Sequence, residues 1–187
     1  MKKLVIGLTA ALMALAFTAC HKNNPSDGGT ATQEDKTPAQ VALSFSFAQT
    51  PEMMQYCTVQ INFESSEGAT QTILLKQEDV DAQCRWNALV SSHKLPASFT
   101  FRRTVTLKED ISSLEHFSYS KGISYQYALY NAAGTQVFLS DFVDNLASSK
   151  LNGSKVAELV KAGKLDRTCT FSFDAEGKMT KQFSSSD

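Results

Sequence analysis

The chain has 187 residues, of which 42% are hydrophobic and 10% aromatic, enough for one globular domain with a substantial core. Its formal net charge is -1, from 18 basic and 19 acidic residues. Because binding to a nucleic-acid backbone requires clustered Lys and Arg, this balance argues against a nucleic-acid partner.

The N-terminal segment has the parts of an export signal. Lys2 and Lys3 provide positive charge, and residues 4–17 form an uncharged, mostly apolar run. This run is too short to span a bilayer as a helix, which needs about 20 residues. We therefore expect residues 1–19 to be a signal peptide that is removed during export.

A cysteine follows this segment directly. Phe17-Thr18-Ala19-Cys20 resembles the lipobox of bacterial lipoproteins, although the family usually has Leu where this chain has Phe17. The resemblance implies that Cys20 carries a lipid that anchors the protein to a membrane of the cell envelope. Since His21 rather than Asp follows the cysteine, the outer membrane is expected, with its periplasmic and surface faces both open.

The next segment lacks the residues that build a core. Residues 21–38 contain no Val, Ile, Leu, Met or aromatic residue. Such a composition cannot bury enough apolar surface to offset the entropy of ordering the chain. We expect residues 20–38 to be the lipidated cysteine with a flexible tether, and residues 39–187 to be a single folded domain.

Alternation of apolar and polar residues predicts strands throughout this domain. The predicted strands cover residues 41–47, 57–63, 70–76, 99–107, 123–129, 137–142, 169–173 and 179–183. Glycine-containing turns at 65–68, 131–134 and 174–177 predict hairpins. Arg103 interrupts the apolar face of its strand, which indicates a strand end, a bulge or a buried acidic partner.

One helix is expected among the strands. Ser154 as N-cap, an apolar stripe and Gly163 as C-cap predict a short helix near residues 154–162. Residues 78–90 fit neither period, so a short helix and an irregular connection both stay open there. The pattern predicts a mainly β protein, an antiparallel β-sandwich of immunoglobulin-like size, with a closed or partly open barrel as the alternative.

The remaining cysteines are Cys57, Cys84 and Cys169. Cys57 and Cys169 face inward in their predicted strands, which is compatible with a disulfide between them and with two buried thiols. No cysteine or histidine pair has the spacing of a metal or redox site, so the sequence predicts neither a metal nor a cofactor.

Aromatic residues are the candidate contact points for a partner. Tyr125, Tyr127 and Tyr130 lie close together, and Trp86 is the only tryptophan. Exposed rings of this kind bind proteins and sugars, whereas buried rings serve the core.

No nucleophile motif or phosphate-binding loop is present in the sequence. We therefore expect a non-enzymatic module that binds or assembles with a protein or glycan of the envelope. An envelope hydrolase acting on glycan or peptide is one alternative, and a structural subunit of a surface appendage or transport complex is another. A pocket with two carboxylates would favour the hydrolase, and an unpaired sheet edge would favour recognition or assembly.

Overall fold

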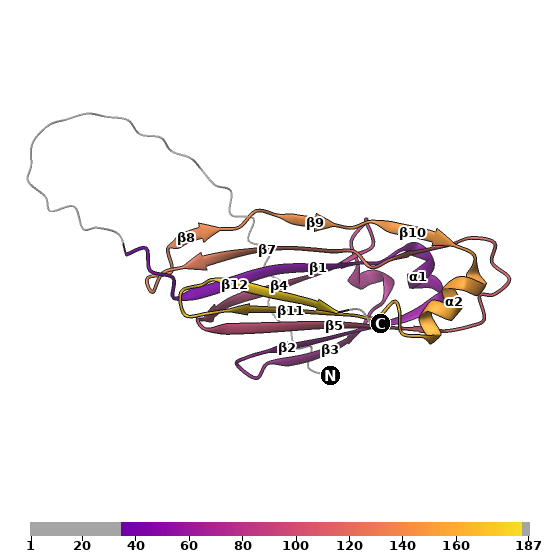
Figure 1. The fold of residues 1–187 in the computed structure, drawn as a ribbon, viewed down its shortest axis with the longest axis horizontal. Coiled ribbons are helices and arrows are strands. Elements are labelled where there is room, and N and C mark those ends of the chain that lie inside the picture. The colour runs from indigo at the N-terminus through magenta and orange to yellow at the C-terminus, as the bar shows by residue number, and fades with distance from the viewer. Residues whose placement is uncertain (1–34, 185–187) are drawn as a thin grey trace, which may run out of the picture. The chain divides into compact units, whose positions relative to one another are not determined.

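Two five-stranded antiparallel sheets and a separate two-stranded sheet make up the fold (Figure 1). The computed structural model describes residues 35–184. The predicted signal peptide, Cys20 and most of the predicted tether lie outside these described residues. Of these, residues 36–184 belong to one compact unit.

The first sheet has the strand order β4-β1-β7-β8, and β9 also pairs with β7. Its strands are β1 (Gln40–Ala48), β4 (Arg85–Lys94), β7 (Ile123–Tyr130), β8 (Gln136–Leu139) and β9 (Val143–Asn145). The second sheet has the order β12-β11-β5-β2-β3. Its strands are β2 (Cys57–Ser65), β3 (Thr70–Leu74), β5 (Ala97–Leu107), β11 (Arg167–Phe173) and β12 (Met179–Ser184). The short strands β6 (Phe117–Ser120) and β10 (Ser148–Leu151) pair with each other.

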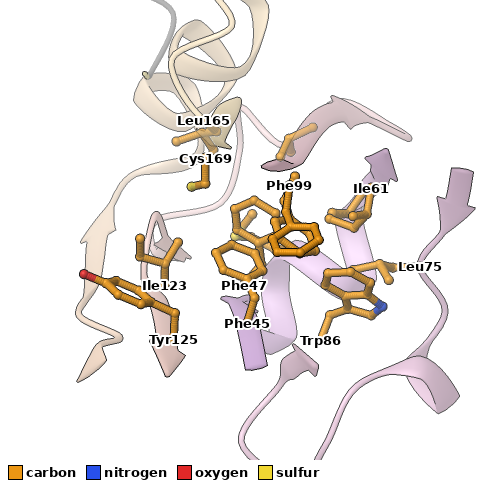
Figure 2. Close-up of a cluster of buried hydrophobic side chains, with 14 of the residues drawn as sticks. Phe45, Phe47, Ile61, Leu75, Trp86, Phe99, Ile123, Tyr125, Leu165 and Cys169 are labelled. Atoms are coloured by element: carbon orange, nitrogen blue, oxygen red, sulfur yellow. The ribbon is translucent and has the colours of Figure 1, made fainter. Parts of the chain in front are cut away.

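The core forms where alternating apolar side chains of the two sheets meet (Figure 2). Phe45 of β1 stacks on Phe101 of β5, with ring centroids 4.2 Å apart. Phe171 of β11 makes edge contacts with both rings, at 5.7 and 6.4 Å. Such pairs contribute about 0.5–1.5 kcal/mol each beyond the burial of their area. The predicted mainly β, antiparallel, sandwich-like fold is therefore confirmed.

The predicted helix near residues 154–162 is confirmed as α2 (Gly153–Lys161). Its N-cap is Asn152 rather than Ser154, because the Asn152 side chain accepts a hydrogen bond from the N–H of Lys155 at 2.9 Å. The buried side chains of α2 are Val156, Ala157 and Val160.

A second helix, α1 (Pro51–Tyr56), was not predicted from the sequence. It begins where the Thr50 hydroxyl accepts a hydrogen bond from the N–H of Met53 at 3.1 Å. The open segment 78–90 contains the end of a 3-10 turn, η1 (Gln77–Asp79), followed by the start of β4.

Arg103 lies inside β5, at neither a strand end nor a bulge, and its side chain is fully buried. Its Nη1 donates to the carbonyl of Ala48 at 2.8 Å and its Nη2 to the carbonyl of Leu165 at 3.0 Å. The guanidinium also lies 5.3 Å from the ring centroid of Phe47. Burial, with repulsion from Arg167, lowers the pKa of Arg103 to about 10, so it stays charged at neutral pH. The acidic partner considered from the sequence is thus replaced by two backbone carbonyls.

The strand register keeps Cys57 and Cys169 apart. Cys57 lies opposite Leu107 of β5, and Cys169 lies opposite Phe101 on the other side of that strand. Six positions along β5 correspond to about 20 Å, whereas disulfide-bonded residues have Cα atoms about 4.4–6.8 Å apart. These two residues therefore cannot form the bridge that the sequence left open, and both are buried free thiols. Burial raises the pKa of each thiol to about 11, which keeps them protonated.

Candidate functional site

Strands β8, β9 and β10 follow one another along one edge of the domain (Figure 1). We call residues 136–151 the edge strip. Within the described residues, β8 and β9 pair only with β7, and β10 pairs only with β6. The outer side of the edge strip is therefore an unpaired sheet edge.

Large apolar side chains that solvent reaches gather on the edge strip. Among the described residues, Leu74 and Leu89 are the only exposed large hydrophobic residues outside it. The edge strip carries Phe138, Leu139, Phe142, Val143 and Leu151. Exposed apolar side chains that gather in one region mark interaction sites more often than scattered single residues do.

Two of these side chains lie on the core face of the sheet. Phe138 is the cross-strand partner of Leu129, and Val143 is the partner of Tyr125. Both partners are buried, yet Phe138 is 45% exposed and Val143 is 37% exposed. Cross-strand partners point to the same side of a sheet, so the core face is left uncovered at this edge.

The edge strip differs in charge from the edge strand β12 of the second sheet. Residues 135–149 contain Asp141 and Asp144 but no Lys, Arg or His. Edge strand β12, by contrast, has an inward-pointing Lys181, whose ammonium donates a hydrogen bond to the Tyr125 hydroxyl. Inward or exposed basic residues on edge strands prevent pairing with other chains. The β8 and β9 part of the edge strip lacks this protection, since the only basic residue of the strip is Lys150 in β10.

Contacts with β6 and β7 hold the edge strip in place. The Ser140 hydroxyl accepts a hydrogen bond from the N–H of Tyr127 at 3.0 Å, and the Ser140 N–H donates to the Tyr127 carbonyl at 2.9 Å. The Ser120 hydroxyl donates to the carbonyl of Ala147 at 2.9 Å. A side chain at Gly122 would place its Cβ 2.6 Å from the Cα of Leu146, so only glycine permits this close approach. The strip is therefore fixed against the domain.

A cavity of about 470 Å³ lies where β1 ends, between the 82–85 turn and the link from β9 to β10. Its lining includes Glu52, Arg85 and the free thiol of Cys84, which has a left-handed backbone with φ of 56°. The buried amide of Gln49, also in the lining, has no hydrogen-bond partner among the described residues. Glu52 is the single carboxylate of the described lining, so this cavity does not hold the pair of carboxylates that most glycoside hydrolases use.

Asp81 organises the turn beside this cavity. Its Oδ1 accepts hydrogen bonds from the N–H groups of Gln83 and Arg85, both at 2.9 Å. Its Oδ2 accepts from Arg85 Nε at 2.9 Å and from Asn87 Nδ2 at 3.1 Å. Burial raises the pKa of the Asp81 carboxyl, but these four hydrogen bonds together outweigh it and hold the pKa below its usual value.

Replacing Asp81 with Asn is expected to lower the free energy of unfolding by about 1–2 kcal/mol at neutral pH. The amide keeps the shape of the carboxylate but turns one acceptor into a donor that faces Arg85 or its backbone. Because the folded pKa of Asp81 is lowered, its stabilisation is present above the unfolded pKa and is lost as pH falls through the folded value. Urea unfolding of both proteins should therefore converge in acid; a difference that stays constant with pH would contradict this role. Asp79→Asn, which affects one exposed hydrogen bond to Lys76, is the control.

The structure places the predicted contact aromatics mainly in the core. Trp86 is 7% exposed and Tyr125 is 2% exposed, at opposite sides of the phenylalanine cluster (Figure 2). Tyr127 is partly buried between Phe138 and Phe173, with ring centroids 5.5 and 5.0 Å away. Trp86 and Tyr125 are therefore core residues, a correction to their expected role. Tyr130 is partly buried and adjoins the hairpin that leads into β8.

The edge strip was not predicted as a site from the sequence. The signal available was the run from Val137 to Val143, in which apolar residues occupy both alternating positions and no base is present. On a strand with one buried face, this pattern leaves apolar side chains in solvent whichever face turns inward.

The described residues contain no group of His, Cys, Asp and Glu that could hold a metal ion. Within residues 35–184, neither α-helix has the length and apolar content needed to cross a bilayer. The fold and the edge strip together define a mainly β, sandwich-like protein with an unpaired apolar sheet edge. No family model, curated protein or solved structure matches the chain.

Proposed function

We propose that the protein is a lipid-anchored lipoprotein of the cell envelope whose domain is a non-enzymatic binding or assembly module for a protein partner. The observation that carries the proposal is the edge strip, an unpaired sheet edge with exposed Phe138, Leu139, Phe142 and Val143. Complete burial of a fully exposed side chain of this kind contributes about 1.5–3 kcal/mol. These four are already about half buried, so a partner that covers them gains only part of that value from each. A protein is favoured over a glycan because two of the four candidate sugar-stacking rings, Trp86 and Tyr125, are buried.

The anchor is supported by the sequence before the domain. Residues 17–20 resemble a lipobox, and a lipidated Cys20 would hold the chain at the outer membrane. Each buried CH₂ of the acyl chains contributes roughly 0.8 kcal/mol to the anchoring. The polar composition of residues 21–38 supports a tether, which would let the edge strip meet a partner away from the lipid surface.

Photo-crosslinking of the full chain in the cells that make it tests this function. A photoreactive residue replacing Leu139 should give a crosslinked product of defined mass, because Leu139 is exposed on the edge strip. The same residue at Leu89, equally apolar and exposed on β4 at the opposite edge of the first sheet, should not. Cys20→Ser should abolish labelling by a fatty-acid analogue and release the protein from the membrane fraction. Equal crosslinking at both positions would overturn the binding site, and an unlabelled wild-type protein would overturn the anchor.

A further inference from the structure

We propose that the edge strip accepts an extended, positively charged segment of the partner as an added strand beside β8 and β9. This inference rests on the proposed function, since it states what chemistry the binding module recognises. Strand addition of this kind gives affinity through main-chain hydrogen bonds and specificity through alternate side chains.

The uncovered core face at this edge favours a strand over another shape. Phe138 and Val143 point to the core side of the first sheet but remain in solvent. One strand inward, Tyr125 contacts Phe183 of β12 in the second sheet, with ring centroids 6.2 Å apart. The two sheets thus face each other here, and Phe183 is itself only partly buried. A strand added beside β8 and β9 would place every second side chain over Phe138 and Val143, on the side of Phe183.

The free edge has the length that a short linear segment requires. β8 has four residues and β9 has three, and each pairs on one side only. The ten positions from Gln136 to Asn145 correspond to about 33 Å of extended chain. At Ser140 between the two strands, both the side chain and the backbone bond to Tyr127 of β7. The side of β8 and β9 that faces β7 is therefore occupied, including at Ser140 between them. An added strand would bind on the opposite, outer side.

The charge of the edge selects a basic segment. Asp141 and Asp144 are exposed, and residues 135–149 contain no basic residue to balance them. Opposite charges across a strand pair are favourable and like charges are unfavourable. A second copy of this chain would bring the aspartates of two edge strips together, whereas lysine or arginine between apolar residues would complement them.

Synthetic peptides test both the strand and the charge. The probe is a fluorescent octapeptide of alternating lysine and valine, titrated into the full chain in detergent at low salt. We expect binding that is roughly tenfold or more tighter than for a matched peptide with glutamate in place of lysine. The lysine peptide with all of its backbone amides N-methylated should lose binding, because neither edge of the peptide can then donate to the sheet. Hydrogen exchange should show protection confined to the amides around residues 136–145.

Matched variants separate the edge strip from the rest of the domain. Val143→Ser should weaken the lysine peptide, and Leu89→Ser should not, since Leu89 lies on the far edge strand β4. The double variant Asp141→Lys, Asp144→Lys changes exposed side chains only, which leaves the core intact, and should reverse the preference to the glutamate peptide.

Three outcomes would overturn the inference: equal binding of lysine and glutamate peptides, retained binding of the N-methylated peptide, or dimerisation through the edge strip in place of peptide binding. Its failure is distinguishable from that of the proposed function. If Leu139 crosslinks in cells but the peptides bind without selectivity, the proposed binding module is supported and the basic added strand is rejected. Loss of both rejects both.

Discussion

Arg103→Ala is expected to lower the free energy of unfolding by about 4 kcal/mol. The substitution removes a fully buried side chain and leaves a cavity in the sheet interface. It also removes the two hydrogen bonds that the guanidinium donates to the carbonyls of Ala48 and Leu165. No other described side chain donates to either carbonyl. Most domains are stable by only about 5–15 kcal/mol, so the midpoint of urea unfolding should fall steeply.

Two further substitutions at this position identify the cause. Arg103→Lys keeps the charge but cannot span two carbonyls from separate elements, so it should recover only part of the loss. Arg103→Met keeps most of the volume and removes both the charge and the hydrogen bonds. Since no acidic side chain is left unpaired by it, a Met variant as stable as the wild type would show that desolvating the guanidinium costs as much as its bonds contribute. That result would contradict a stabilising role for Arg103.

Gly153→Ala is expected to destabilise the protein by about 3 kcal/mol, near the upper end of the usual range for overpacking. Gly153 begins α2, and its N–H donates to the carbonyl of Leu114 at 2.8 Å. A Cβ there would lie 1.8 Å from the carbonyl oxygen of Ile111, which is backbone and cannot rotate aside. The helix and the loop before β6 would have to separate, which would expose Ile111 and Val156, both fully buried.

Gly134→Ala is the matched control. Gly134 has a φ of +81° in the hairpin between β7 and β8, with open space where a Cβ would lie. Its substitution should cost about 1–2 kcal/mol from backbone strain alone. Thermal unfolding of the two variants should therefore rank Gly153→Ala well below Gly134→Ala; equal losses would show that the contact with Ile111 is not what requires glycine.

Alternation predicts the central strands because each has one buried face and one solvated or polar face. In β1, for example, Val41, Leu43, Phe45 and Phe47 are all fully buried. β4 was not predicted because its apolar residues do not alternate cleanly with polar ones. Trp86 and Val90 are buried, but Leu89 between them is apolar and exposed. The pairing also shifts by one residue between Val41 and Leu43, a bulge that interrupts the pattern further.

The partners of Arg103 could not be read from local sequence. They lie 55 and 62 positions away, and both are backbone carbonyls, which every residue has. The edge strip was beyond prediction for a related reason. Phe138 and Val143 lie on the side of the strand that faces the core. Only the strand order shows that no further strand covers them. The alternation along one segment predicts which face of a strand turns toward the core. The order of the strands decides whether another element covers that face.

The position of β1 between β4 and β7 has a consequence for biosynthesis. It is the first strand of the domain to be made, yet it pairs on one side with β4 and on the other with β7, which begins only at residue 123. Until β7 has been synthesised, the nascent chain exposes Phe45 and Phe47 on a strand with an unpaired edge. Pairing between strands that are far apart in the sequence slows folding, and it prolongs the lifetime of aggregation-prone intermediates. A chain built in this order benefits from a holding chaperone from the moment its N-terminal third leaves the ribosome.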